Sequence, residues 1–197
     1  MAKTLPFEEN TEQYDAWFEK HQAAYESELA AVRELLPEYR SGIEIGVGSG
    51  RFAGPLGIRH GVEPSEKMAE IARKKGIRVV SGTAEQLPFP AAQFDLALMV
   101  TTICFVDEAG KAMREAYRIL KAGGFFLNCF IDKTSPIGKI YQTHQEESVF
   151  YRSAVFVSVD EVVDSMRNAG FQDLSFVQTL FHSLPELSGV EPVKPGY

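Results

Sequence analysis

The stretch that decides the fold is "GIEIGVGSG" at Gly42–Gly50, where an acid, Glu44, stands among apolar residues. Three alternating glycines, Gly46, Gly48 and Gly50, follow this short apolar segment. Glycine permits positive φ and lets another group approach the backbone closely. A strand-to-helix turn without a ligand is the alternative, but such a turn does not need three alternating glycines. We therefore predict a ligand-binding loop at the end of a buried strand.

Short apolar segments alternate with helical patterns on both sides of this loop. Further strands are predicted at residues 60–64, 77–82, 94–102, 125–131 and 173–181. Helices are predicted at residues 10–36, 65–75, 108–120 and 158–169, with a short one near residue 53. Nearly continuous apolar strands that alternate with helices indicate a parallel sheet covered on both faces. The predicted fold class is therefore α/β, doubly wound, with a mostly parallel sheet.

Composition excludes several classes of function. The chain has 197 residues and a net charge of −7, whereas nucleic-acid binding usually needs a basic surface. No apolar run is long enough to span a bilayer, and the start of the chain lacks the layout of a signal peptide. Cys104 and Cys129 lie in apolar runs without the spacing of metal ligands. We expect a cytoplasmic protein with no metal, no nucleic-acid partner and no membrane partner.

The ligand of the glycine loop has two interpretations. In doubly wound sheets, ligands bind outside the carboxyl ends of the strands. Residues 48–53, "GSGRFA", match a dinucleotide fingerprint, which would favour a nucleotide-dependent oxidoreductase. However, the acid expected about twenty residues further on falls inside a helix. Glu63 stands instead at the end of the second strand, where a carboxylate can accept hydrogen bonds from two ribose hydroxyls.

Four ordered segments resemble the class I S-adenosylmethionine-dependent methyltransferases, in the small-molecule branch of the ubiquinone-biosynthesis type (methyltransferase type 11). They are "IEIGVGSGRF", "GVEPSEKMAEIAR", "GTAEQLPFPAAQFDLALMV" and "EAYRILKAGGFFLNCF", and the likeness covers roughly residues 14–181. The resemblance implies a Rossmann-like fold, S-adenosylmethionine as cofactor and a small-molecule methyl acceptor. A non-enzymatic cofactor-binding module of the same fold is the alternative.

The resemblance also implies which residues bind the cofactor. Glu44 would lie near the methionine amino group, and a cationic ligand would explain a buried carboxylate. Glu63 would hold the ribose. Thr83 stands where the family commonly has an acid for the adenine, so that Ala84 or Glu85 would replace that contact. The implied cofactor-binding residues are Glu44, Gly46, Gly48, Gly50, Glu63, Pro64, Met68, Thr83, Ala84, Glu85 and Thr101. Core packing for Met68 and strand propensity for Thr101 are the alternatives.

No catalytic motif is evident. Methyl transfer from a sulfonium depends mainly on positioning, and a general base is needed only for a protonated acceptor. The candidate catalytic residues are His21, His144 and Tyr14. The candidate acceptor contacts are Tyr14, Trp17, His21, Tyr25, Tyr141, His144 and Tyr151, for which packing of an aromatic helix face is the alternative.

We predict three regions along the chain. Residues 1–40 form a helical lid, residues 41–183 form the cofactor-binding α/β domain with a variable acceptor-side insertion at 132–157, and residues 184–197 form an irregular tail. The family's last antiparallel strand has no apolar run left to form it after Phe181. We expect this strand to be missing, supplied otherwise or lost by truncation, and the unpaired strand edges to favour self-association as a homodimer.

Overall fold

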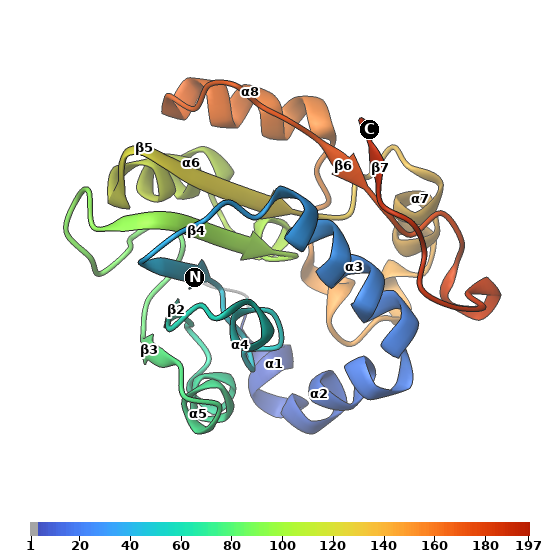
Figure 1. Ribbon diagram of the computed structural model, residues 1–197. Helices are drawn as coiled ribbons and strands as arrows, with labels where there is room; N and C mark the ends of the chain where they lie inside the picture. Colours follow the sequence, from blue (N-terminus) through green and yellow to red (C-terminus); the bar gives the residue numbers. More distant parts are fainter. Residues whose placement is uncertain (1–3) are drawn as a thin grey trace.

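A five-stranded parallel sheet forms the centre of the molecule in a computed structural model that describes residues 4–197 (Figure 1). The strands run in the order β3-β2-β1-β4-β5, and every neighbouring pair is parallel. Their bounds are Gly42–Ile45 (β1), His60–Val62 (β2), Arg78–Val80 (β3), Phe94–Val100 (β4) and Leu120–Cys129 (β5). The predicted α/β fold class is confirmed. The winding reverses between β1 and β4, which is where such sheets bind ligands.

Helices cover both faces of the sheet. Three N-terminal helices precede it: α1 (Leu5–Glu9), α2 (Thr11–Lys20) and α3 (Gln22–Leu35). The others are α4 (Ala53–Leu56), α5 (Glu66–Lys74), α6 (Ala109–Ile119), α7 (Pro136–Thr143) and α8 (Val159–Ala169). Alternate side chains of β4 separate two core clusters. Ala97 and Met99 pack with α6 and α8, whereas Leu96 and Leu98 pack with α3 and α4 on the opposite face (Figure 1).

Local capping signals decide several helix ends. Ser65 accepts a hydrogen bond from the Met68 amide and begins α5 as predicted. Ser158 and Glu161 form a capping box at the start of α8, where the predicted helix begins. The side chain of Asn10, where the helix predicted over residues 10–36 begins, does not cap α2: its amide donates to the Pro6 carbonyl, because Asn10 also ends the unpredicted helix α1. The single helix predicted over residues 10–36 breaks at His21 into α2 and α3.

The end of the sheet differs from the sequence prediction. The strand predicted at 173–181 is reduced to β6 (Val177–Gln178), which pairs antiparallel with β7 (Lys194–Pro195) outside the central sheet. Asp173 and Leu180 adopt positive φ on either side of β6, so that the extended segment is interrupted at both ends. The predicted strand at 125–131 begins earlier, at Leu120, because that residue already pairs with β4 before an irregularity in the ladder. β5 is consequently the last strand of the central sheet.

Candidate functional site

The three glycines after β1 all adopt left-handed backbone conformations, with φ of 72°, 52° and 79° at Gly46, Gly48 and Gly50. A Cβ on Gly46 would lie 2.6 Å from Thr102 Cγ2, and one on Gly50 would lie 2.5 Å from Ile77 Cδ1. Both distances are far below van der Waals contact. Two of the glycines therefore admit neighbouring side chains of the protein itself.

Gly48 differs from the other two glycines. A Cβ there would lie 3.5 Å from both Met68 Cε and the Tyr14 hydroxyl oxygen, which is ordinary van der Waals contact. Its amide donates a 2.8 Å hydrogen bond to Glu63 Oε2. Gly48 is thus the one of these three glycines at which an added Cβ would meet no clash.

Glu63 connects the end of β2 to the glycine loop. Besides the Gly48 amide, its carboxylate accepts a 3.0 Å hydrogen bond from the Ser65 amide, and the residue is 7% exposed. Burial raises the pKa of Glu63 to about 7, although the two hydrogen bonds oppose that rise. A ligand that donates further hydrogen bonds to Glu63 would therefore stabilise its ionised form.

Glu44 lies on β1 and is 2% exposed. Its Oε2 accepts a 2.8 Å hydrogen bond from the amide of Ala53, the first residue of α4. Burial, together with the charge of Glu63, raises the pKa of Glu44 well above its usual value. One backbone hydrogen bond thus compensates part of the cost of a buried acid, and a cation in the site would compensate more.

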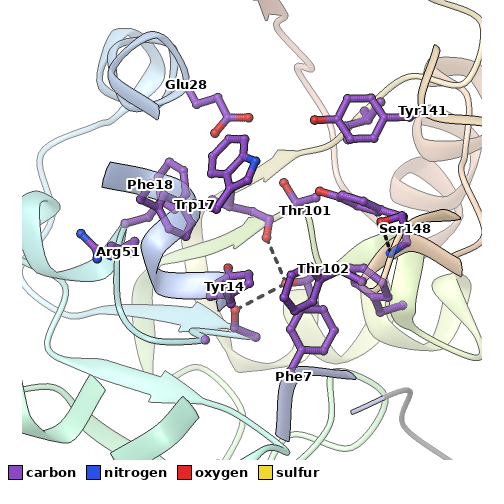
Figure 2. Close-up of a pocket in the computed structure, with 18 of the residues that line it drawn as sticks. Phe7, Tyr14, Trp17, Phe18, Glu28, Arg51, Thr101, Thr102, Tyr141 and Ser148 are labelled. Atoms are coloured by element: carbon purple, nitrogen blue, oxygen red, sulfur yellow. Dashed lines mark hydrogen bonds between the residues drawn. The ribbon is translucent and has the colours of Figure 1, made fainter. Parts of the chain in front are cut away.

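A cavity of about 460 Å³ opens at the carboxyl ends of the strands (Figure 2). Its lining includes twelve of the predicted site residues: Tyr14, Glu44, Gly46, Gly48, Glu63, Pro64, Met68, Thr83, Ala84, Glu85, Thr101 and His144. Gly50 and His21 lie outside this lining. Gly50 sits against Ile77, and the His21 ring is 5.2 Å from the Trp17 ring, where burial lowers its pKa.

The predicted adenine segment lies in the cavity wall, but Glu85 has a partner within the protein. Its Oε1 accepts hydrogen bonds from the amides of Asp107 at 2.7 Å and Glu108 at 3.5 Å. The Gln86 amide donates to the Thr83 carbonyl across a tight turn. Glu85 therefore supports the segment before α6, and Ala84, which is buried, lies between it and Thr83.

The end of β4 carries backbone strain. Thr101 has a φ of 50°, which is rare for a β-branched residue and is found where the surrounding structure enforces it. Its amide donates a 2.8 Å hydrogen bond to the Cys129 carbonyl, and the Thr102 hydroxyl donates to the Val100 carbonyl at 3.1 Å. Both threonines line the cavity (Figure 2).

Aromatic side chains from three segments close the cavity. Phe7 of α1 contacts Tyr14 of α2, Phe105 and Phe150, with ring centroids 5.1–5.7 Å apart. Burial, and then the charges of Glu63 and Glu44, raises the pKa of Tyr14 far above its usual value, so that its hydroxyl stays protonated. Of the other predicted acceptor contacts, Trp17, Tyr141 and Tyr151 line the cavity. Tyr25 does not, and its hydroxyl donates to the Arg51 carbonyl at 2.6 Å.

An ion-pair cluster joins α2 to the glycine loop. The Asp15 carboxylate accepts hydrogen bonds from Arg51 Nε and from the Ser49 hydroxyl, each at 2.7 Å. Arg51 also donates to Glu19 at 2.7 Å, and Lys75 Nζ lies 3.6 Å from Asp15 Oδ1. These contacts lower the pKa of Asp15 despite its partial burial. The cluster positions α2 over the loop.

Replacing Asp15 by alanine is expected to release α2 from the loop. Arg51 and the buried Ser49 would lose their shared acceptor, a loss of about 1–3 kcal/mol. Amide hydrogen exchange should then accelerate at α1 and α2 but not in β1 or β4. Glu12→Gln, an exposed change on the same helix, is the matched control. Unchanged exchange in the Asp15 variant would contradict this role.

Sequence reasoning missed several lining residues. Phe7, Phe105 and Phe150 were not singled out, nor was Glu28 of α3. A signal for Glu28 exists: it follows Tyr25 by three residues and precedes Val32 by four, so it is an acid on the apolar stripe of its helix. The aromatic residues meet only through the tertiary fold.

Comparisons with known proteins add an independent line of observation. A family model described as "Methyltransferase domain" matches residues 43–128. A crystal structure from Thermotoga maritima, described as a SAM-dependent methyltransferase and possible histamine N-methyltransferase, is 55% identical, with a TM-score of 0.95 over 98% of this chain and 93% of that one.

Two curated relatives extend the comparison. The uncharacterised protein MJ1123 of Methanocaldococcus jannaschii is 40% identical over 97% of this chain and 92% of its own length. The mitochondrial 2-methoxy-6-polyprenyl-1,4-benzoquinol methylase of Xenopus laevis is 30% identical over 67% of this chain, which spans 46% of that protein. Within residues 4–197, the structure has no helix that is both long and apolar enough to cross a membrane.

Proposed function

The chain belongs to the S-adenosylmethionine-dependent methyltransferases, and from this premise we propose that its cavity presents the cofactor's methyl group to a small-molecule acceptor. The observation that carries the proposal is a pair of buried carboxylates, Glu44 and Glu63, in the wall of one cavity that Gly48 also lines. A phosphate group would be repelled there. A cationic, phosphate-free adenosine compound suits the charge of this wall.

Each residue of this cavity wall can be assigned to one part of the cofactor. We propose that Glu63 accepts hydrogen bonds from the ribose hydroxyls and that Glu44 faces the methionine ammonium. Gly48 lets the cofactor contact the backbone, while Met68 and Ala84 provide apolar surface for the adenine. The bound cofactor supplies an electrophilic methyl group. The protein contributes orientation and exclusion of water, which are the main requirements of this reaction.

The closed part of the cavity favours a small molecule, rather than a macromolecule, as the methyl acceptor. The cavity is closed by rings from α1, α2 and the region 132–157, and the net charge of −7 disfavours a nucleic acid. The Thermotoga relative is described as a possible histamine N-methyltransferase and the Xenopus relative as a benzoquinol methylase. Histamine and benzoquinols are both small molecules.

The structure is compatible with the regions that we expect along the chain. We propose that residues 1–40 act as a lid, residues 41–183 as the cofactor-binding domain and residues 132–157 as the acceptor-side insertion, with 184–197 as a tail. Contacts of α1 and α2 with the cavity support the lid. The buried Cys104 and the partly buried Cys129 are compatible with the reducing, cytoplasmic setting that we propose. The edge position of β5 supports a homodimer.

Binding of S-adenosylhomocysteine tests this proposal through its pH dependence. The free protein holds Glu63 largely protonated below its pKa of about 7, and Glu44 is shifted in the same direction. Ribose hydroxyls and an ammonium favour the ionised acids. Binding at pH 6 should therefore release about one proton per carboxyl that ionises, and affinity should rise from pH 5.5 to 8. Calorimetry in two buffers of different ionisation enthalpy measures both quantities.

NADH is the control ligand for the same experiment. At pH 8, where Glu63 is ionised, its carboxylate beside Gly48 should repel the pyrophosphate of NADH, so we expect no binding of NADH at concentrations that saturate the protein with S-adenosylhomocysteine. Tight binding of NADH alone, or S-adenosylhomocysteine binding without proton release, would show that the two acids do not have the proposed roles.

A further inference from the structure

A fourth carboxylate, besides those of Glu44, Glu63 and Glu85, lines the cavity away from the glycine loop. Glu28 lies on α3, and Figure 2 shows its side chain pointing into the space bounded by Trp17, Thr101 and Tyr141. Burial, and then the charge of Glu28, raises the pKa of Tyr141. Nothing in the proposed cofactor contacts uses this acid.

The other charged groups of the cavity wall have partners within the protein or in the proposed cofactor. Glu44 and Glu63 face the cofactor, and Glu85 accepts backbone hydrogen bonds. The three basic residues of the wall are Arg51, His144 and His182, and each lies beside an acid: Asp15 and Glu19, Glu147, and Glu191 respectively. Within residues 4–197, the side chain of Glu28 has neither a hydrogen bond nor an ion pair. A partly buried carboxylate without a partner favours a cationic ligand.

The surroundings of Glu28 suit an organic cation. The Trp17, Tyr141 and Tyr151 rings line the same cavity, and aromatic faces attract ammonium groups electrostatically. Building on the proposed function, we propose that the methyl acceptor is a small amine whose ammonium group is held by Glu28 against the rings of Trp17 and Tyr141.

Glu28 also has the chemistry to prepare such an acceptor. A protonated amine has no lone pair for methyl transfer. Burial raises the pKa of Glu28 to about 7, so its carboxylate is a stronger base than an exposed acid. Glu28 accepts the proton: an N–H bond breaks, an O–H bond forms, the acid becomes neutral and the neutral amine keeps the lone pair.

Glu28 also borders a second, larger space. Glu28, Thr101 and Ile131 line both the cavity and a larger groove of about 1470 Å³ between α3, β5 and the segment around β6. The acceptor can thus reach Glu28 from this groove while the cofactor occupies the glycine-loop side. The two ligands meet near Thr101, at the end of β4.

The groups whose pKa the charge of Glu28 affects do not titrate between pH 5.5 and 8. Its charge affects Tyr14, Tyr141, Tyr151 and Cys129, and each of these groups has a raised pKa, to about 12 for Tyr141 and Cys129. They stay neutral from pH 5.5 to 8. Of Glu28 and these four groups, Glu28 is the one that changes charge, and amine binding should strengthen as the pH rises through 7.

Matched pairs of ligands test the inference in protein saturated with S-adenosylhomocysteine. The probes are propylamine, benzylamine, phenethylamine and tryptamine, each compared with its alcohol by calorimetry at pH 8. We expect at least one amine to bind tenfold or more tightly than its alcohol. Glu28→Gln should abolish that preference and leave alcohol binding unchanged. Glu34→Gln, an exposed change on the same helix, should retain the preference.

The outcomes separate this inference from the proposed function. If wild-type protein binds S-adenosylhomocysteine but prefers none of the amines, or if Glu28→Gln retains the preference, the amine assignment is overturned. If S-adenosylhomocysteine does not bind at all, the proposed function fails instead. Loss of S-adenosylhomocysteine binding in Glu28→Gln would place Glu28 at the cofactor and would also overturn the inference.

Discussion

Glu63→Ala is expected to weaken S-adenosylhomocysteine binding about 30- to 700-fold, which corresponds to about 2–4 kcal/mol. The substitution removes the proposed acceptor of two ribose hydroxyls, and charged hydrogen bonds contribute more than neutral ones. It also deletes the carboxylate that holds the Gly48 amide at 2.8 Å, so the loop is less well ordered before the ligand arrives. Calorimetry at pH 8, where Glu63 is ionised in wild type, gives the difference directly.

Glu63→Ala should weaken ligand binding most at high pH, but it should lower the stability of the free protein most at low pH. Because the folded-state pKa of Glu63 is raised to about 7, its contribution to stability is fully present below pH 4.5 and is lost as the pH rises through 7. Glu63→Ala should thus lower the free energy of unfolding less at pH 8 than at pH 5, and at pH 8 it could even raise it. Thermal unfolding at both pH values separates this effect from the binding loss.

Glu63→Gln is the control for this experiment. An amide oxygen can still accept from Gly48 or Ser65, but the charge and one acceptor are lost, so we expect an intermediate affinity. If Glu63→Ala binds as tightly as wild type, Glu63 does not hold the ribose, and its carboxylate serves the loop alone.

Local signals made much of the fold predictable. The end of α8 at Gly170 and its start at Ser158 depend on residues within a few positions, and both were predicted. Glu63 was singled out because its place at the end of the second strand is a local pattern. The strand predicted at 173–181 was wrong because positive φ at Asp173 and Leu180 interrupts it, which the residue types do not reveal.

The cavity wall depends on contacts distant in sequence. Asp15 and Arg51 are 36 residues apart, and neither residue type indicates the other. Phe7 meets Phe150 only once α1 folds over the sheet. Glu28 could have been noticed as an acid on an apolar helix face, but whether it faces solvent or a cavity is decided by the packing of α3. The central sheet was therefore more predictable than the acceptor side.

Gly46→Ala is expected to destabilise the protein by about 2–5 kcal/mol. An L-residue in the left-handed region costs about 1–2 kcal/mol, and overpacking in a tight site costs about 1–3 kcal/mol more. Gly46 has both penalties, since its φ is 72° and an added Cβ would lie 2.6 Å from Thr102 Cγ2. For a chain of this size each kcal/mol lowers the Tm by about 2–4 °C.

Gly48→Ala is the matched control, because it has the conformational penalty without the clash. Its φ is 52°, but its added Cβ would meet nothing closer than 3.5 Å. We expect Gly48→Ala to lose only about 1–2 kcal/mol of stability. Its methyl group would occupy space facing Met68 and Tyr14, so its S-adenosylhomocysteine affinity should fall more than its Tm suggests.

A second-site change distinguishes the two penalties at Gly46. Thr102→Ala removes the Oγ1 and Cγ2 atoms that an added Cβ would meet and leaves only the Thr102 Cβ at 3.0 Å. In the Gly46→Ala background, this change should restore the part of the stability that the clash removes, but not the part due to positive φ. If Gly46→Ala and Gly48→Ala unfold at the same Tm, or if Thr102→Ala restores nothing, close approach of Thr102 is not the reason for a glycine at this position. The loop would then require glycine at position 46 for its backbone conformation alone.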